Sequence, residues 1–371
     1  MSAETSFRLP RLLLPRAGTD LKKWAVIACD QYTSEPEYWQ RIADEVGTAP
    51  STLRLILPEV HLTSADVTER IAAIQGAMRR YVAEGLLQEH QGAIYVERTI
   101  GNRVRRGLML ELDLEEYNFG RDSASLIRPT EGTIVERIAP RIAVRRGAEL
   151  ELPHILVLID DPEGTVIEPI GDGNHSLATA KAYWDSIKAS VGLDHPARYA
   201  LVEIENIHDP ALEFEPIHRV LFGVTKDFRQ ALAAAFGASF SCTDVPSAEA
   251  MRERVRKGRE GCHVVGLIGP GERFSVVVVS DPPSTLPVGT IQPFIDRFIE
   301  QGGAASIDYV HGDEALDKLS VSEGNVGVYL PGLDKGDLLR MVVREGPLPR
   351  KTFSMGEAHE KRFYMEARRS R

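Results

Sequence analysis

The sequence predicts a mixed α/β protein with more than one domain. The chain has 371 residues, and at roughly 150 residues per domain this length favours two domains. Hydrophobic residues make up 43% of the chain and charged residues 26%, which is ordinary for a globular protein with a large core. Between residues 293 and 344, apolar runs typical of strands alternate with helical patterns, and this alternation favours an α/β layer.

The first domain is expected to cover residues 1–225. Residues 23–28 form a short apolar run that predicts a strand, and a polar loop follows it as far as Glu35. Ser34 and Ser64 each precede a helical pattern, as an N-capping residue does. Further patterns predict strands at 93–98, 106–113, 154–160, 165–170 and 199–204, and a helix at 177–191.

Residues 226–283 predict a small α+β subdomain. Its helical patterns lie at 228–236 and 249–257, and its strand patterns at 238–242, 264–268 and 274–279. The last two strands are joined by Gly269-Pro270-Gly271-Glu272, a sequence typical of a hairpin turn. Residues 284–371 are expected to form a C-terminal α/β segment that returns to the core. It has helices at 293–300, 313–319 and 335–344 and strands at 307–310 and 326–330.

Composition argues against several classes of protein. Cys29, Cys242 and Cys262 form no Cys-x-x-Cys pair, which argues against a disulfide framework and a zinc site. No apolar run approaches the ~20 residues of a membrane helix, and residues 12–14 are too short an apolar core for a signal peptide. The formal charge of −10 argues against nucleic-acid binding, which needs Lys and Arg to neutralise phosphates. We therefore expect a cytoplasmic protein that acts on small molecules.

One stretch departs from this acidic balance. Five arginines with few acids among them lie at positions 128, 137, 141, 145 and 146. Such a stretch focuses a small anion, or it is a solvated basic face.

The segment Gly171-Asp172-Gly173-Asn174-His175-Ser176 lies between a β-prone run and a helical pattern. Its two glycines allow the main chain to approach a ligand closely. N–H groups at the start of the following helix would point at a bound anion, and the helix dipole would attract it. Asp172 could hold Mg²⁺, while Asn174 and His175 could donate hydrogen bonds to phosphate. An N-capped turn without a ligand is the alternative.

Four other blocks carry residues suited to chemistry. In the segment 127–133, Arg128 is a candidate clamp for phosphate or carboxylate, Thr130 and Thr133 offer hydroxyls, and Glu131 is a candidate base or metal ligand. An ordinary loop with a surface ion pair is the alternative. The remaining blocks are His218-Arg219, the polar loop 30–35 with Glu35, and the basic segment 350–352 with Lys351. The chain lacks a P-loop motif, a Gly-x-Ser-x-Gly elbow and a His-Glu-x-x-His motif.

These blocks together resemble a bacterial and archaeal domain-of-unknown-function family often labelled ParB-like. One block is Gly-Asp-Gly-Asn-His-Ser-Leu-Ala-Thr-Ala-Lys, at residues 171–181, and the blocks together are far more specific than any one alone. The resemblance spans nearly the whole chain, in family order, with blocks at 29–39, 128–133, 171–181, 216–219 and 351–357.

The resemblance implies a core like that of the ParB/sulfiredoxin superfamily, in which a Gly-x-His-Arg-type turn holds nucleotide or pyrophosphate oxygens at a helix N-terminus. Free serine kinases share that turn, and some relatives resemble serine kinases that use inorganic pyrophosphate. It also implies phosphate or metal contacts for Asp172, Asn174 and His175. Further pocket residues implied in the same way are Arg128, Glu131, His218, Arg219 and Lys351.

Two features depart from the family pattern. Ser176 stands where many relatives have Arg, so a cation that clamps phosphate must come from elsewhere, with Arg128, Arg219 or Lys351 as candidates. Relatives also carry a longer stretch than residues 162–170 before the Gly-Asp-Gly-Asn-His block.

The function expected from these features is a kinase that phosphorylates free L-serine. The donor is ATP, ADP or pyrophosphate, Asp172 holds Mg²⁺, and Gly173, Asn174, His175 and Ser176 bind the donor phosphate. Glu131 or Glu35 accepts the hydroxyl proton, and an arginine grips the carboxylate of the acceptor. The alternatives are a nucleotide-binding ParB-like regulator and a non-catalytic relative.

Overall fold

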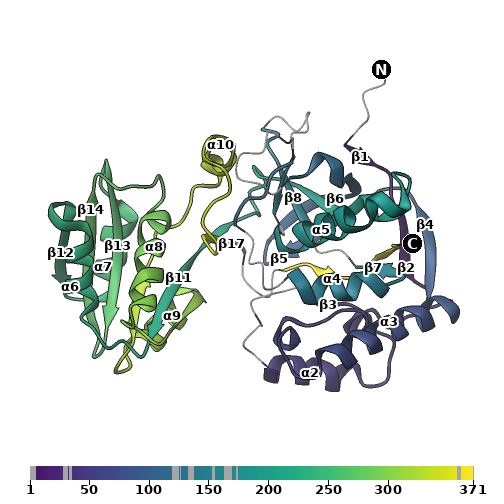
Figure 1. Ribbon diagram of the computed structural model, residues 1–371, viewed down its shortest axis with the longest axis horizontal. Coiled ribbons are helices and arrows are strands. Elements are labelled where there is room, and N and C mark those ends of the chain that lie inside the picture. Colours follow the sequence, from purple (N-terminus) through teal and green to yellow (C-terminus); the bar gives the residue numbers. More distant parts are fainter. Residues whose placement is uncertain are drawn as a thin grey trace. The chain divides into compact units, whose positions relative to one another are not determined.

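The computed structural model describes residues 6–27, 32, 36–118, 125, 127–132, 138–152, 155–162, 169–172, 174–356 and 361–370. The chain divides into two compact units (Figure 1). Unit 1 comprises residues 1–212, 339–347 and 358–371, and unit 2 comprises residues 213–338 and 348–357. Both units combine helices with sheets, which confirms the mixed α/β class. Within the described residues, no helix is long and apolar enough to cross a membrane.

Unit 1 is built on a six-stranded sheet with the order β1-β6-β10-β8-β9, in which β5 also pairs with β6. Its strands are β1 (Phe7–Arg8), β5 (Ile94–Ile100), β6 (Arg103–Asp113), β8 (Ile155–Ile159), β9 (Pro169–Asp172) and β10 (Tyr199–Asn206). The pair β8–β10 is parallel, with Val157 opposite Ile204, and the other pairs are antiparallel. All five residues of β8 are buried, as expected of a strand covered on both faces.

Helix α5 (Asn174–Val191) covers one face of this sheet (Figure 1). Its Leu177 and Trp184 are 1% and 0% exposed and pack in one core with Val157 and Val202 from the strands beneath. The 3-10 helices η3 (Leu114–Glu116) and η5 (Pro196–Arg198) flank this layer.

The opposite face of the sheet carries a buried layer of paired charges. Glu203 and Glu205 of β10 are each 1% exposed. Arg98 Nη2 donates to both carboxylate oxygens of Glu203, at 2.6 and 2.7 Å. Arg362 Nε lies 2.7 Å from Glu203 Oε2, and Arg105 Nε lies 3.2 Å from Glu205 Oε1. Buried charges need such partners, because an isolated ion loses its hydration without compensation.

A second, four-stranded sheet in unit 1 joins distant parts of the sequence. Its order is β4 (Leu87–Gln91), β2 (Arg11–Pro15), β19 (Ala367–Arg369) and β7 (Leu150–Glu151). Leu13 and Ala367 from this sheet share a core with Trp24 and with Met78 and Tyr81 of helix α3 (Val67–Ala83). The other elements here are α1 (Leu21–Trp24), α2 (Pro36–Val46), η1 (Thr52–Arg54), η2 (Glu59–His61), α4 (Ile138–Gly147) and the pair β3 (Val26–Ile27) with β18 (Phe363–Tyr364).

Unit 2 is a seven-stranded sheet with the order β12-β14-β13-β16-β11-β15, in which β17 also pairs with β11. Its strands are β11 (Phe214–Phe222), β12 (Phe240–Val245), β13 (Cys262–Gly269), β14 (Arg273–Ser280), β15 (Ser306–His311), β16 (Val326–Tyr329) and β17 (Phe353–Met355). Its helices are α6 (Phe228–Phe236), η6 (Gly237–Ser239), α7 (Ala248–Lys257), α8 (Pro287–Glu300) and α9 (Asp313–Ser320). Helix α10 (Lys335–Glu345) crosses the boundary at residue 338.

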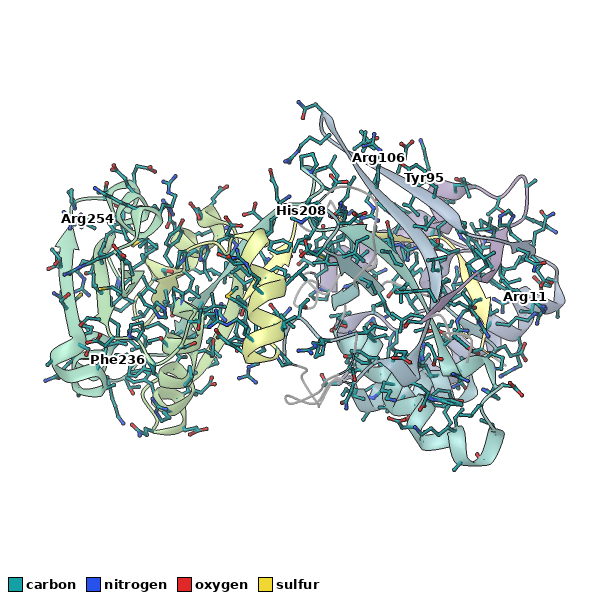
Figure 2. The ribbon with its side chains drawn as sticks, turned by 90° about the horizontal axis from the view of Figure 1, so that it is seen from above. Arg11, Tyr95, Arg106, His208, Phe236 and Arg254 are labelled. Carbon is teal, nitrogen blue, oxygen red and sulfur yellow. The ribbon has the colours of Figure 1, made fainter. Side chains whose placement is uncertain are left out.

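Figure 2 shows side chains that face outward on both units. Tyr95 on β5 is 59% exposed, and Arg106 on β6 lies on the same hairpin. Arg254 on α7 is exposed, as expected for a solvated helix face, whereas Arg252 turns inward and pairs with Asp313 and Asp317 of α9.

Several sequence predictions need correction. Residues 226–283 do not form a separate subdomain, because β13 pairs with β16 and so joins them to the rest of unit 2. The strand expected at 23–28 begins later, because Asp20 caps the short helix α1 and the described strand residues are Val26–Ile27. The helix expected from residue 293 begins at Pro287, and Pro293 lies inside it. The hairpin expected at Gly269-Pro270-Gly271-Glu272 is confirmed by the pairing of β13 with β14.

Candidate functional site

The backbone of residues 171–176 leads from a strand into a helix. Strand β9 ends at Asp172, which lies opposite Leu156 of β8, and α5 begins at Asn174. This confirms the expected strand-to-helix arrangement. Gly173 and the side chains of Asp172, Asn174 and His175 lie outside the described part of the structure. The first N–H groups of α5 have no partner within the helix and form a partial positive charge that favours anions.

An arginine from another helix reaches this helix start. Arg141 of α4 donates through Nη1 to Ser176 Oγ at 3.3 Å, and its Nη2 pairs with Glu59 of η2. A cation beside a helix N-terminus is unfavourable on its own, because the helix dipole is positive there. The ion pair with Glu59 offsets that repulsion, and the positive end of the helix dipole favours an anion. Arg141 therefore supplies a guanidinium group beside Ser176.

The basic stretch between residues 128 and 146 is not simply a solvated face. Arg145 pairs with Glu151 of β7, in addition to the pair that Arg141 forms with Glu59. Burial lowers the pKa of Arg145 to about 9, and the nearby charge of Arg368 acts in the same direction. These contacts tie α4 to its neighbours within unit 1.

The block from Ile127 to Gly132 belongs to the same unit. Ile127 is fully buried and shares the core with Leu177 in the first turn of α5. Arg128 donates through Nε to the Ser125 carbonyl at 3.1 Å and through Nη1 to the Val343 carbonyl at 3.2 Å. Among the described residues, no carboxylate lies within ion-pair distance of Arg128. No described carboxylate therefore compensates the positive charge of Arg128.

The neighbours of Arg128 differ in exposure. Thr130 is fully buried, and Glu131 is half-buried. Thr133 and Glu35 lie outside the described residues, as do Asp30 and Gln31. Arg128, Thr130, Glu131 and Ser176 thus belong to unit 1, as does the start of α5.

His218, Arg219 and Lys351 belong to unit 2. Arg219 is fully buried and donates to Gln292 Oε1 at 2.9 Å, to the Arg350 carbonyl at 3.3 Å and to the Ile217 carbonyl. Its guanidinium also lies over the Tyr309 ring, 5.2 Å from the centroid. These contacts indicate that Arg219 organises the core of unit 2. Sequence patterns do not reveal this, because Gln292 lies 73 positions away.

Both ring nitrogens of His218 have protein neighbours. The side chain is 1% exposed, and its Nδ1 accepts a hydrogen bond of 3.1 Å from the Leu330 N–H. Its Nε2 lies 3.5 Å from Asp313 Oδ1, and the ring stacks on Tyr329 at 4.5 Å. These contacts favour a structural role over substrate binding. Lys351 is half-buried with a φ of 56°.

We expect His218 to make the stability of unit 2 depend on pH. Burial lowers its pKa below the usual value, although Asp313 acts in the opposite direction. The unfolded chain therefore takes up this proton near pH ~6.5 while the folded chain does not. The stabilisation is complete above that pH and is lost as the pH falls, by at most about 1.4 kcal/mol per pH unit.

Urea unfolding followed by fluorescence, between pH 7.5 and 5.5 (about one unit either side of a free histidine), measures this effect. His218→Gln should show a smaller loss of unfolding free energy over that interval than the unaltered protein. Asp313, whose pKa is lowered mainly by its hydrogen bond with His218, titrates below this interval and does not confuse the result. Equal losses in the two proteins would contradict the prediction.

Comparison with known sequences identifies the family of the chain. A family model described as "Protein of unknown function (DUF1015)" matches residues 13–170 and 169–298. The chain belongs to this family. No curated protein matches the DUF1015 chain.

Several solved structures are similar to this DUF1015 chain. A mutant free serine kinase in complex with ADP is 14% identical, covers 73% of this chain and 95% of its own, and has a TM-score of 0.47. A conserved hypothetical protein from Pyrococcus furiosus is 16% identical, with coverages of 67% and 90% and a TM-score of 0.42. SbnI from Staphylococcus aureus, with a C-terminal truncation, is 11% identical, with coverages of 69% and 85% and a TM-score of 0.41.

The sequence did not single out two features of the DUF1015 chain. Arg141 was one of five arginines, and only the structure shows that it reaches Ser176. A pocket between α2 and α3 was also missed, although alanines and arginines at helical spacing along α3 gave a faint signal.

Proposed function

We propose that this protein is a phosphotransferase that phosphorylates a small hydroxylated acid, with free L-serine as the first candidate. ATP, ADP and pyrophosphate are the candidate donors. The observation that carries the proposal is the direct passage from β9 into α5, with Arg141 beside the first turn. Backbone N–H groups and a cation meet there, and such groups suit phosphoryl transfer, which relies on positioning and charge stabilisation.

In this proposal, residues 172–176 bind the donor. Asp172 holds Mg²⁺, while Gly173, Asn174, His175 and Ser176 contact the phosphate. Mg²⁺ is a hard cation that is commonly held by one or two carboxylates together with substrate phosphates. The described residues contain no cluster of three or more His, Cys, Asp or Glu side chains suited to a metal. A single carboxylate at the end of β9, completed by donor phosphates, fits this requirement.

The acceptor is assigned to the block from Arg128 to Thr133. Arg128 grips the carboxylate of the amino acid, because its guanidinium meets no described carboxylate and planar forks suit such groups. Thr130 and Thr133 position the acceptor, and Glu131 or Glu35 accepts its hydroxyl proton. The internal contacts of His218 and Arg219 favour structural roles, so neither is assigned to the acceptor here. Lys351 is kept as a candidate phosphate contact.

The decisive experiment is ³¹P NMR of the purified protein with L-serine and Mg²⁺, using ATP, ADP and pyrophosphate in separate samples. We expect a phosphoserine signal with at least one donor. If no donor yields phosphoserine and none binds in calorimetry, the kinase proposal is wrong. Donor binding without turnover would instead support the nucleotide-binding regulator.

The same assay shows which of Glu131 and Glu35 is the catalytic base and which has no catalytic role. We expect either Glu131→Gln or Glu35→Gln to lower kcat by about 10²–10⁴-fold, the usual contribution of a general base, and the other to change it only slightly. Glu116→Gln, at an exposed position on η3, is the matched control. Full activity in both variants would remove both residues from the proposed role.

A further inference from the structure

A pocket of about 580 Å³ lies in unit 1 between helices α2 and α3. Its remaining wall is the segment from Leu53 to His61, which includes η1 and η2. Figure 1 shows α2 and α3 along the same side of unit 1. Pockets that hold small organic ligands typically measure about 300–1,000 Å³, so this one is large enough.

The pocket exists because the facing helix surfaces carry alanine. On α3, Arg70, Ala73, Ile74, Ala77 and Arg80 recur at helical spacing and line it. On α2, Pro36, Trp39, Gln40 and Ala43 recur in the same way. Residues three or four positions apart share one helix face. Small side chains at 43, 73 and 77 therefore leave a hollow where two helices would otherwise pack with larger ones.

The charged side chains of the lining are all arginines. Arg54, Arg70 and Arg80 line the pocket, and no Asp or Glu among the described residues does. His61 also lines it, but burial and the charge of Arg70 lower its pKa. Arg70 is paired with Asp66 at 2.9 Å, outside the lining. The other two arginines have no carboxylate partner within the described residues.

The contacts of these two arginines leave their charges uncompensated. Arg54 donates to the carbonyls of Gly47 and Ala49. Arg80 lies over the Tyr81 ring, 5.6 Å from the centroid. The chain has a formal charge of −10, whereas arginines without carboxylate partners among the described residues make the pocket locally positive. A local positive charge of this kind attracts anions.

Apart from Gln40, the rest of the lining is apolar. Trp39, Ile74 and Ala77 are each 6% exposed, so they form a buried, largely dehydrated wall. Trp39 is fixed in place, because its Nε1 donates to the Tyr32 carbonyl at 3.0 Å. Apolar walls with a few polar groups are typical of sites that fix the orientation of a small ligand.

We propose that this pocket binds a small organic anion with an apolar body and a carboxylate or phosphate head. The body packs against Trp39 and Ile74, and the head meets Arg80 and Arg54. The proposal does not rest on phosphoryl transfer, because every lining residue lies outside the residues assigned to that reaction.

Calorimetry with naphthyl compounds of equal size and different charge tests the proposal, without nucleotide present. Naphthylacetate and naphthyl phosphate are the anionic probes, and they distinguish the two heads. Naphthaleneethanol and naphthylmethylamine are the neutral and cationic probes. We expect at least one anionic probe to bind about tenfold or more tightly than the neutral one, the effect of a charge-assisted hydrogen bond. No binding by either anion, or equal binding by the neutral probe, overturns the proposal.

Two matched pairs of variants locate the site. Ala73→Leu should fill the pocket and abolish binding of the anionic probe, whereas Ala72→Leu, at an exposed neighbouring position outside the lining, should not. Arg80→Gln should weaken anion binding by about 10- to 100-fold, whereas Arg79→Gln should leave it unchanged. Both arginines are exposed, so neither change threatens folding. Binding that survives both Ala73→Leu and Arg80→Gln would show that the anion binds elsewhere.

Discussion

Asp172→Ala is expected to abolish Mg²⁺-dependent formation of phosphoserine. Asp172 ends β9 next to the first turn of α5, so its removal deletes the carboxylate proposed to hold the metal beside the donor phosphate. A catalytic metal supplies several kcal/mol of charge stabilisation in the transition state. Because each 1.4 kcal/mol corresponds to about a tenfold change in rate, we expect a loss of roughly 10³-fold or more. ³¹P NMR with saturating donor and serine measures it.

The control for this substitution lies on the helix that follows β9. Asp185 of α5 is partly exposed and pairs with Lys181 and Lys188. Asp185→Ala should therefore keep nearly full turnover, although it removes the same type of side chain from the same unit. Circular dichroism of both variants checks that they fold. Turnover in Asp172→Ala that responds to Mg²⁺ as before would exclude Asp172 as the metal ligand.

Glu203→Ala is expected to cause the largest loss of stability. Its carboxylate is 1% exposed and is shared between Arg98 and Arg362, so its removal takes one buried carboxylate partner from each of two guanidinium groups. Breaking a buried ion pair from one side costs about 3–5 kcal/mol, because the remaining charge stays buried and uncompensated. Urea unfolding at neutral pH should show a loss of this size in unit 1.

Glu97→Ala on neighbouring strand β5 is the matched control. Glu97 is 57% exposed and lies 3.7 Å from Arg106, a surface pair that contributes at most about 1 kcal/mol. The unfolding free energy of this variant should therefore remain close to that of the unaltered protein. If Glu203→Ala were no more destabilising than Glu97→Ala, the buried charges would not stabilise the layer.

Sequence patterns predicted the helices and strands whose apolar residues follow a clear pattern within one continuous segment. The run that became β8 is apolar at every position, and α5 and the β13–β14 hairpin have clear periods, so their existence could be inferred. The two-residue strand β7 and the three-residue strand β19 carry too few residues for any period to appear. Their pairing depends on contacts between residues more than 200 positions apart.

The same distinction between local features and contacts of distant residues applies to the candidate site. The strand-to-helix passage at residues 171–176 could be predicted, because glycines and a helical pattern are local features. The contact of Arg141 with Ser176 could not, because it joins two helices that the sequence does not relate. Arg219 shows the converse, because an arginine that looked suited to phosphate is committed to Gln292 and to backbone carbonyls.

The placement of β19 bears on how the newly made chain folds. This strand, at residues 367–369, lies between β2 and β7, so one edge of β2 has no partner until residues 367–369 have left the ribosome. By then the residues of unit 2, which end at 357, have already been synthesised. Domains commonly fold from the N-terminus onward during translation. Here the inserted unit can mature first, while residues 11–15 keep an open strand edge, a feature that invites aggregation and chaperone binding.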